Sequence, residues 1–300
     1  KSPVYWGCNN RPRFMGVCLE RAAKAIEAGA DMLQFDDWAL IASASAWGGA
    51  CFCTNCMAAF PADLRANVPP AELARLRIPA TGPFDYRHYL AARHGITNAA
   101  SYAAQRRSLP TSPHFDAFHR RSIRAFFKDL GARIAAIAGR RIPMSINANL
   151  SDPSQERKFL TDTVDFVQGE TLHFHPDPLA LAAKVAEGMG KWHIFVTQSL
   201  DVPEARAGIA TVYALGQLPM VPWDMYMGSD ETTVQPRGWG TVEQYGDLFH
   251  FVRDNPSLLD DAKPLATAGL IIDIDHCDRS QAFAACRRLL DAQVPFAVIP

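Results

Sequence analysis

Short apolar runs alternate with longer amphipathic segments along most of the chain. The apolar runs predict strands at residues 4–6, 31–37, 142–147, 164–168, 192–197 and 218–223. The amphipathic segments predict helices at residues 12–28, 119–138, 178–187 and 203–215. Because each return to a parallel strand needs a crossover, this alternation predicts a parallel sheet with helices packed on it.

Two stretches depart from the alternation. Residues 61–113 are rich in Ala, Arg and Pro and form an excursion between strands, with a helical piece at 70–77. After residue 263 a new unit begins, with strands at 268–274 and 295–299 around a helix at 279–292. We therefore expect a (β/α)8 TIM barrel over residues 1–263, without its first strands, and the start of another α/β domain over 264–300. The alternatives are a doubly wound open sheet, or a smaller and unusual fold.

Composition and charge exclude several classes of partner. Of the 300 residues, 48% are hydrophobic and 20% are charged, as in a soluble protein with a sizeable core. Thirty Lys and Arg face 31 Asp and Glu, so there is no electrostatic footprint for nucleic acid or an anionic membrane. No apolar run approaches the roughly 18 residues that span a bilayer. No secretory signal is visible, which leaves cytoplasmic and periplasmic locations both open.

Three of the seven cysteines lie close together at C-x-C-x-x-C spacing, as Cys51, Cys53 and Cys56. One turn of backbone can wrap three thiolates around a tetrahedral ion. Cys8, which follows the strand predicted at residues 4–6, is the best candidate for a fourth ligand. Four thiolates would close the site, so we expect a structural zinc. The alternative is a loop of reduced cysteines, one of them reactive.

Polar residues follow the predicted strands at their C-terminal ends, which form the active-site rim in barrels and the ligand edge in open sheets. They are Asp36, Asp37, Asn147, Asn149, Glu170, Gln198 and Asp224. Glycoside hydrolysis needs two carboxyl groups flanking the scissile bond. We favour Asp37 with Glu170. Adjacent strand residues point to opposite faces, so Asp36 is the alternative to Asp37, and Asp224 is the substitute partner.

Several further side chains suit contact with a sugar. Trp38 and Trp223 carry indoles that stack on apolar sugar faces. Asn147, Asn149 and Gln198 can bind hydroxyl groups. His173 and His175 alternate along an extended segment, and they suit hydroxyl contacts or, less well, a catalytic metal.

The chain resembles glycoside hydrolase family 42, the β-galactosidase family. Cys8 with Cys51, Cys53 and Cys56 matches the zinc-binding cysteines of that family, and residues 57–60 and 113–118 resemble its helix starts. Residues 268–300 resemble the start of its flavodoxin-like trimerisation domain, which implies a homo-oligomer, either a trimer or a dimer. The catalytic glutamates differ. Asp36-Asp37-Trp38 stands at the family's Asn-Glu pair, and Thr197-Gln198-Ser199 stands at its nucleophile.

We therefore expect a glycoside hydrolase that acts on an oligo- or polysaccharide through a pair of carboxylates. The first alternative is a carbohydrate-binding or assembly protein without catalysis, which Gln198 in place of a carboxylate favours. The second is a metal-dependent enzyme that uses His173 and His175.

Overall fold

The computed structural model describes residues 7–36, 50–148, 150, 160–172, 176–198, 201–220, 242–258, 263, 265–273 and 278–299. The chain divides into two compact units. We call Lys1–Leu33 with Asp37–Ile142 the helical unit, and Gln34–Asp36 with Pro143–Pro300 the sheet unit. Each is described by itself.

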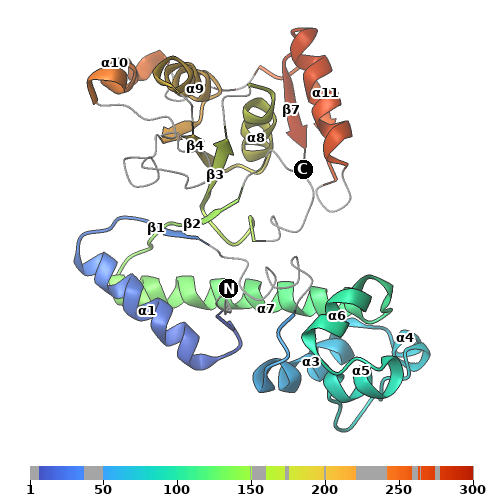
Figure 1. The fold of residues 1–300 in the computed structure, drawn as a ribbon. Helices are drawn as coiled ribbons and strands as arrows, with labels where there is room; N and C mark the ends of the chain where they lie inside the picture. The colour runs from blue at the N-terminus through green and yellow to red at the C-terminus, as the bar shows by residue number, and fades with distance from the viewer. Residues whose placement is uncertain are drawn as a thin grey trace. The chain divides into compact units, whose positions relative to one another are not determined.

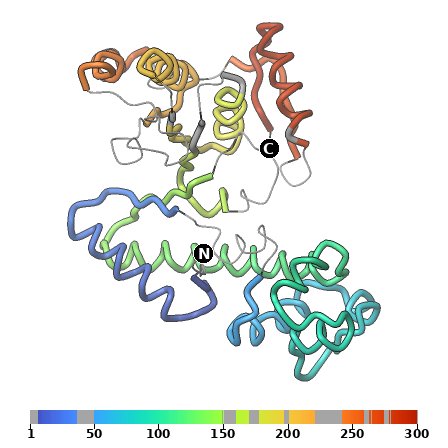
Figure 2. Tube along the Cα trace, viewed as in Figure 1, coloured from blue at the N-terminus to red at the C-terminus, as the bar shows by residue number. Residues whose placement is uncertain are grey.

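In the helical unit, a short helix and a long helix pack side by side, as Figures 1 and 2 show. The short helix is α1 (Pro12–Glu27), which has proline in its first turn. The long helix is α7 (Ser112–Ala138), and it ends at Gly139 in the left-handed conformation that glycine adopts without strain. Both helices agree with the sequence pattern, although α7 begins before residue 119.

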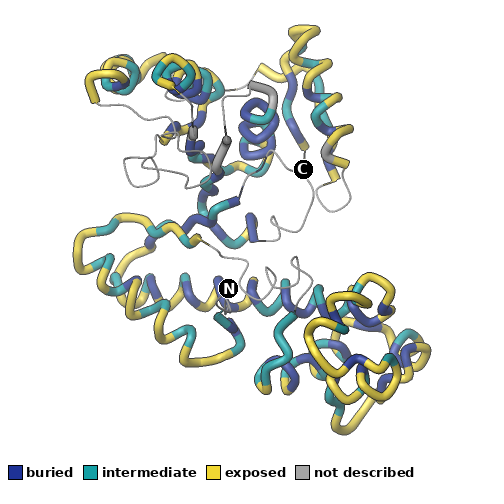
Figure 3. Tube along the Cα trace, in the orientation of Figure 1, coloured by how far each residue is buried: buried dark blue, intermediate teal, exposed yellow. Residues whose placement is uncertain are grey.

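One face of α7 supplies much of the core of the helical unit (Figure 3). Its fully buried side chains include Ile123, Leu130 and Ile134, which recur at helical spacing. Ile137 belongs to the same sequence pattern but is 49% exposed, because it lies in the last turn of the helix.

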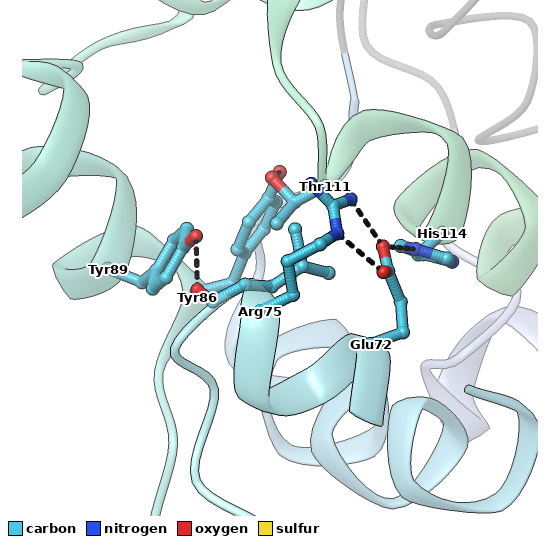
Figure 4. Close-up of polar contacts among 7 residues, drawn as sticks. Glu72, Arg75, Tyr86, Tyr89, Thr111 and His114 are labelled. Atoms are coloured by element: carbon cyan, nitrogen blue, oxygen red, sulfur yellow. Dashed lines mark hydrogen bonds and ion pairs between the residues drawn. The ribbon is translucent and has the colours of Figure 1, made fainter. Parts of the chain in front are cut away.

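The excursion between strands folds into short helices. They are α3 (Thr54–Asn67), α4 (Pro70–Arg75), α5 (Tyr86–His94), α6 (Ala99–Gln105) and the 3-10 turn η1 (Arg106–Ser108). Figure 4 shows how polar contacts join α4 and α5 to the start of α7. The Glu72 carboxylate accepts two hydrogen bonds of 2.7 Å from Arg75 and lies 3.7 Å from His114 Nε2. The Tyr86 hydroxyl lies 2.8 Å from the hydroxyl of Thr111, the residue before α7.

The sheet unit is built on a sheet whose five described strands run in the order β1-β2-β3-β4-β5 (Figure 1). They are β1 (Leu33–Phe35), β2 (Met144–Asn147), β3 (Phe166–Leu172), β4 (Trp192–Gln198) and β5 (Leu218–Met220). The pairings β2–β3, β3–β4 and β4–β5 are parallel. Crossover helices α8 (Pro176–Gly188) and α9 (Val202–Ala214) separate the later strands, as the pattern predicted.

The remaining elements of this unit follow α10 (Val242–Asp254) and the turn η3 (Pro256–Leu258). They are β6 (Ala268–Ile271), α11 (Arg279–Asp291) and β7 (Phe296–Ile299), and β6 pairs with β7 in parallel. Helix α8 packs against β4, β7 and α11, which explains why its middle is almost wholly buried (Figure 3).

The predicted mixed α/β fold with a parallel sheet is confirmed at this level. Closure into a (β/α)8 barrel and the domain division at residues 263 and 264 remain predictions. The strand predicted at residues 164–168 is β3, which begins at Phe166 and continues to Leu172. Glu170 therefore lies within the strand and not after it. The predicted strand at residues 4–6 and the last three residues of the one at 218–223 lie outside the described residues.

We expect Leu130→Ala to lower the free energy of unfolding by about 3 kcal/mol, because it removes a side chain with no exposed surface and leaves a cavity in the core. Urea unfolding followed by circular dichroism measures this loss. Lys128→Ala is the matched control on the exposed face of α7, and its change should stay within about 0.5 kcal/mol. Equal stability of the two variants would contradict the assigned core face.

Candidate functional site

Four cysteine sulfur atoms converge in the helical unit. The Sγ atoms of Cys8, Cys51, Cys53 and Cys56 all lie within 4.8 Å of one another. The Cys8 sulfur lies 3.6 Å from that of Cys53 and 3.6 Å from that of Cys56. The fourth cysteine expected from the sequence is therefore in place.

Two helix starts hold these cysteines. Cys8 lies in a turn just before α1 begins. Its backbone carbonyl accepts a hydrogen bond of 3.0 Å from the backbone amide of Arg11. Cys53 is the N-cap residue of α3, and Cys56 is buried in the first turn of that helix. Backbone N–H groups at a helix start favour negative charge, which suits thiolate sulfur. Helices α1 and α3 both pack on α7, so the long helix supports both halves of the cluster.

The separations fit a single metal ion. A disulfide would bring two sulfur atoms to about 2.05 Å, far closer than the 3.6 Å separations here. A tetrahedral ion with bonds of about 2.3 Å to sulfur would hold neighbouring sulfurs about 3.8 Å apart. The four sulfurs are thus compatible with a closed, four-coordinate metal site.

Hydrogen bonds among the thiols shift their pKa values in opposite directions. The pKa of Cys51 is lowered to about 2, because the thiols of Cys56 and Cys8 donate hydrogen bonds to its sulfur. The hydrogen bond to Cys51 raises the pKa of Cys8 to about 12 and also raises the pKa of Cys56, since it stabilises their protonated forms. The neighbouring thiols thus stabilise a thiolate within the cluster, and a cation would be attracted to it.

Polar side chains surround the sulfurs. The Asn10 amide donates a hydrogen bond of 3.3 Å to the Cys56 sulfur and accepts one of 2.8 Å from the Ser122 hydroxyl on α7. His119, also on α7 and fully buried, is hydrogen-bonded to the backbone of Cys51. Burial lowers the pKa of His119 to about 4, so its ring is neutral at pH 7. Second-layer contacts of this kind orient metal ligands.

Sequence reasoning did not find these supporting residues. Asn10 lies two positions after Cys8, and that nearness was the available signal for it. Ser122 and His119 are distant in sequence, and only the packing of α7 brings them to the cysteines.

The sheet unit brings two of the predicted rim residues together. Asp36 follows the last residue of β1, and Asn147 ends the neighbouring strand β2. The Asn147 amide donates a hydrogen bond of 3.0 Å to the Asp36 carboxylate, which is exposed. Both residues occupy the C-terminal edge of the sheet, where parallel strands gather their following residues.

The course of the backbone places two further predicted residues on the next strands, β3 and β4. Glu170 pairs with Val196 across β3 and β4, and Gln198 ends β4 opposite Leu172. The other predicted site residues lie outside the described residues. They are Asp37, Trp38, Asn149, His173, His175, Trp223 and Asp224.

The described helices contain none with both the length and the apolarity that crossing a membrane requires. No known protein-family profile matches the chain. No solved structure matches it either.

The chain is similar to two enzymes named alpha-agarase. It is 24% identical over 287 residues to the alpha-agarase of Thalassotalea agarivorans, an alignment that covers 89% of this chain and 19% of that protein. It is 24% identical over 288 residues to the alpha-agarase of Alteromonas agarilytica, covering 89% of this chain and 20% of that protein. The chain thus spans about a fifth of the length of these relatives. The likeness is to glycoside hydrolases, and the resemblance to family 42 in particular remains a prediction.

Proposed function

We propose that this chain is part of a glycoside hydrolase that acts on an agar-type polysaccharide and that carries a structural zinc ion. The observation that carries the proposal is the similarity to two alpha-agarases over 89% of the chain. It is supported by the C-terminal edge of a parallel sheet, where Asp36 meets Asn147.

The proposed chemistry uses two carboxyl groups at that edge. One protonates the leaving oxygen of the glycosidic bond, and the other attacks the sugar or activates water. Asp37 and Glu170 are the proposed pair, with Asp36 and Asp224 as substitutes. We propose that Asn147 and Gln198, which end β2 and β4, bind sugar hydroxyls. Asn149, His173 and His175 would extend these polar contacts, and Trp38 and Trp223 would stack on sugar rings.

A second candidate is a carbohydrate-binding protein without catalysis. Gln198 favours it. In glycoside hydrolase family 42, which the chain resembles, the nucleophilic glutamate stands at this strand end, whereas here the side chain is an amide. Such a protein would bind the polysaccharide without cleaving it. A homo-oligomer remains a prediction under both candidates.

The proposed zinc would be held by Cys8, Cys51, Cys53 and Cys56. All four ligands would come from the protein, so no position would remain open for a substrate or water. Its effect would be on stability, because the ion would join the starts of α1 and α3. The ion would supply no step of the hydrolysis.

We expect Asp37→Asn and Glu170→Gln each to lower the release of reducing ends from agarose by at least about 100-fold, since each would remove a general acid, a base or a nucleophile. Circular dichroism would show that both variants remain folded. Asp31→Asn is the matched control, because Asp31 lies before β1, away from the C-terminal edge. Asp36→Asn tests the alternative acid. Near-normal turnover in both Asp37→Asn and Glu170→Gln would end the assignment.

We expect the purified protein to contain about one zinc per chain by mass spectrometry of the metal. Cys53→Ser should lose most of it, whereas Cys18→Ser, which changes a cysteine outside the cluster, should keep it. A chelator should lower the melting temperature of the parent and of Cys18→Ser by about 5 °C or more, with little effect on Cys53→Ser. Equal zinc content in all three proteins would refute this site.

A further inference from the structure

The helical unit contains a cavity of about 510 Å³ beside the cysteine loop. Ala50 and Phe52, which flank Cys51, form one wall, and the other walls come from α5, from α6 and from the segment that joins them. The volume falls within the range of about 300 to 1,000 Å³ that small-molecule sites occupy. Neither the metal site nor the sheet edge uses this cavity.

The lining is apolar at the base and polar at the rim. Leu90, Ile96 and Tyr102 line the cavity, and each is at most 4% exposed. His88 and Asn98 also line it and are exposed. A ligand that fits must therefore have an apolar face together with groups that form hydrogen bonds, and a sugar ring has both.

Phe52 provides a firmly held aromatic surface in this lining. Its ring meets that of Tyr102 edge-on at a centroid distance of 5.0 Å and lies 5.1 Å from the ring of Phe115. The residues on either side of it, Cys51 and Cys53, belong to the sulfur cluster. These ring contacts hold Phe52 in place, so a ligand that stacks on it would lose little binding free energy to the ordering of the protein.

The charge at the rim is balanced, which favours a neutral ligand. The Arg87 guanidinium lies 2.6 Å from the Asp85 carboxylate. This ion pair holds the pKa of Asp85 at about 2, so both groups stay charged and matched at neutral pH. A carboxylated or phosphorylated ligand would have to compete with Asp85 for Arg87.

We propose that this cavity is a binding site for one or two rings of a neutral saccharide, with Phe52 as the stacking surface and with His88 and Asn98 as hydroxyl-binding groups. The choice of a saccharide rests on the proposed function, whereas the site itself rests on the shape and chemistry of the cavity. The sulfur cluster would set the position of the Phe52 wall.

Filling the cavity from an exposed position tests the proposal. Ala91 lines the cavity and is exposed, so Ala91→Trp should block it without disturbing the core. Ala92→Trp is the matched control, because Ala92 is the next residue of α5, is exposed and does not line the cavity. Isothermal titration with a neutral agarose-derived oligosaccharide should show an affinity at least about ten-fold weaker for Ala91→Trp and unchanged for Ala92→Trp.

Phe52→Leu is a second variant, which keeps apolar volume but removes the aromatic face. It should lower the affinity for the oligosaccharide several-fold. Its melting temperature should match that of the parent, which would show that the cluster is intact. Equal affinity in the parent and in Ala91→Trp would overturn the saccharide site.

Hydrolysis of agarose by the same proteins separates the two proposals. Cleavage by the parent together with unchanged affinity in Ala91→Trp would overturn the cavity proposal alone. Absence of both binding and cleavage in the parent would overturn both proposals. If Ala91→Trp bound the dye 1-anilinonaphthalene-8-sulfonate more weakly than the parent but bound the oligosaccharide equally well, the cavity would be a site for apolar ligands instead.

Discussion

The convergence of four sulfur atoms within 4.8 Å is the constraint on which the helical unit depends. It joins the turn before α1 to the first turn of α3, two helix starts that are more than 40 residues apart in the chain. Bringing such distant residues together costs chain entropy, and the burial of Cys56 and the support of α7 help to offset it. Asn10, Ser122 and His119 then surround the sulfurs with polar groups, so the cluster is part of the packing and not an isolated loop.

The same constraint shapes the surface next to it. Because Phe52 lies between two of the cysteines, its ring is held where Tyr102 and Phe115 pack against it. One element of sequence, C-x-C-x-x-C, thus supplies three sulfur atoms to the cluster and an aromatic wall to the cavity. Under our proposals, a metal that stabilises the fold would also keep a saccharide site in shape without taking part in bond cleavage.

In the sheet unit the organising constraint is the parallel arrangement of strands. Parallel strands place all of their C-terminal ends at one edge, so residues far apart in sequence become neighbours there. The hydrogen bond from Asn147 to Asp36 joins residues 111 positions apart. Under our proposal, which the similarity to two alpha-agarases supports, this edge carries the carboxyl groups of a glycoside hydrolase.

The sequence by itself determined the alternation of strands and helices, the extent of α1, the C-terminal end of α7, and the four cysteines of the cluster. These features follow from local rules, namely hydrophobic periodicity, proline and glycine at helix ends, and the spacing of thiols around one ion. Only the tertiary structure decided that β3 extends past Glu170, that α7 brings Ser122 and His119 to the cysteines, and that a cavity opens beside Phe52. Those features arise from side chains that meet across long stretches of chain, and hydrophobic periodicity carries no record of which distant residues will meet.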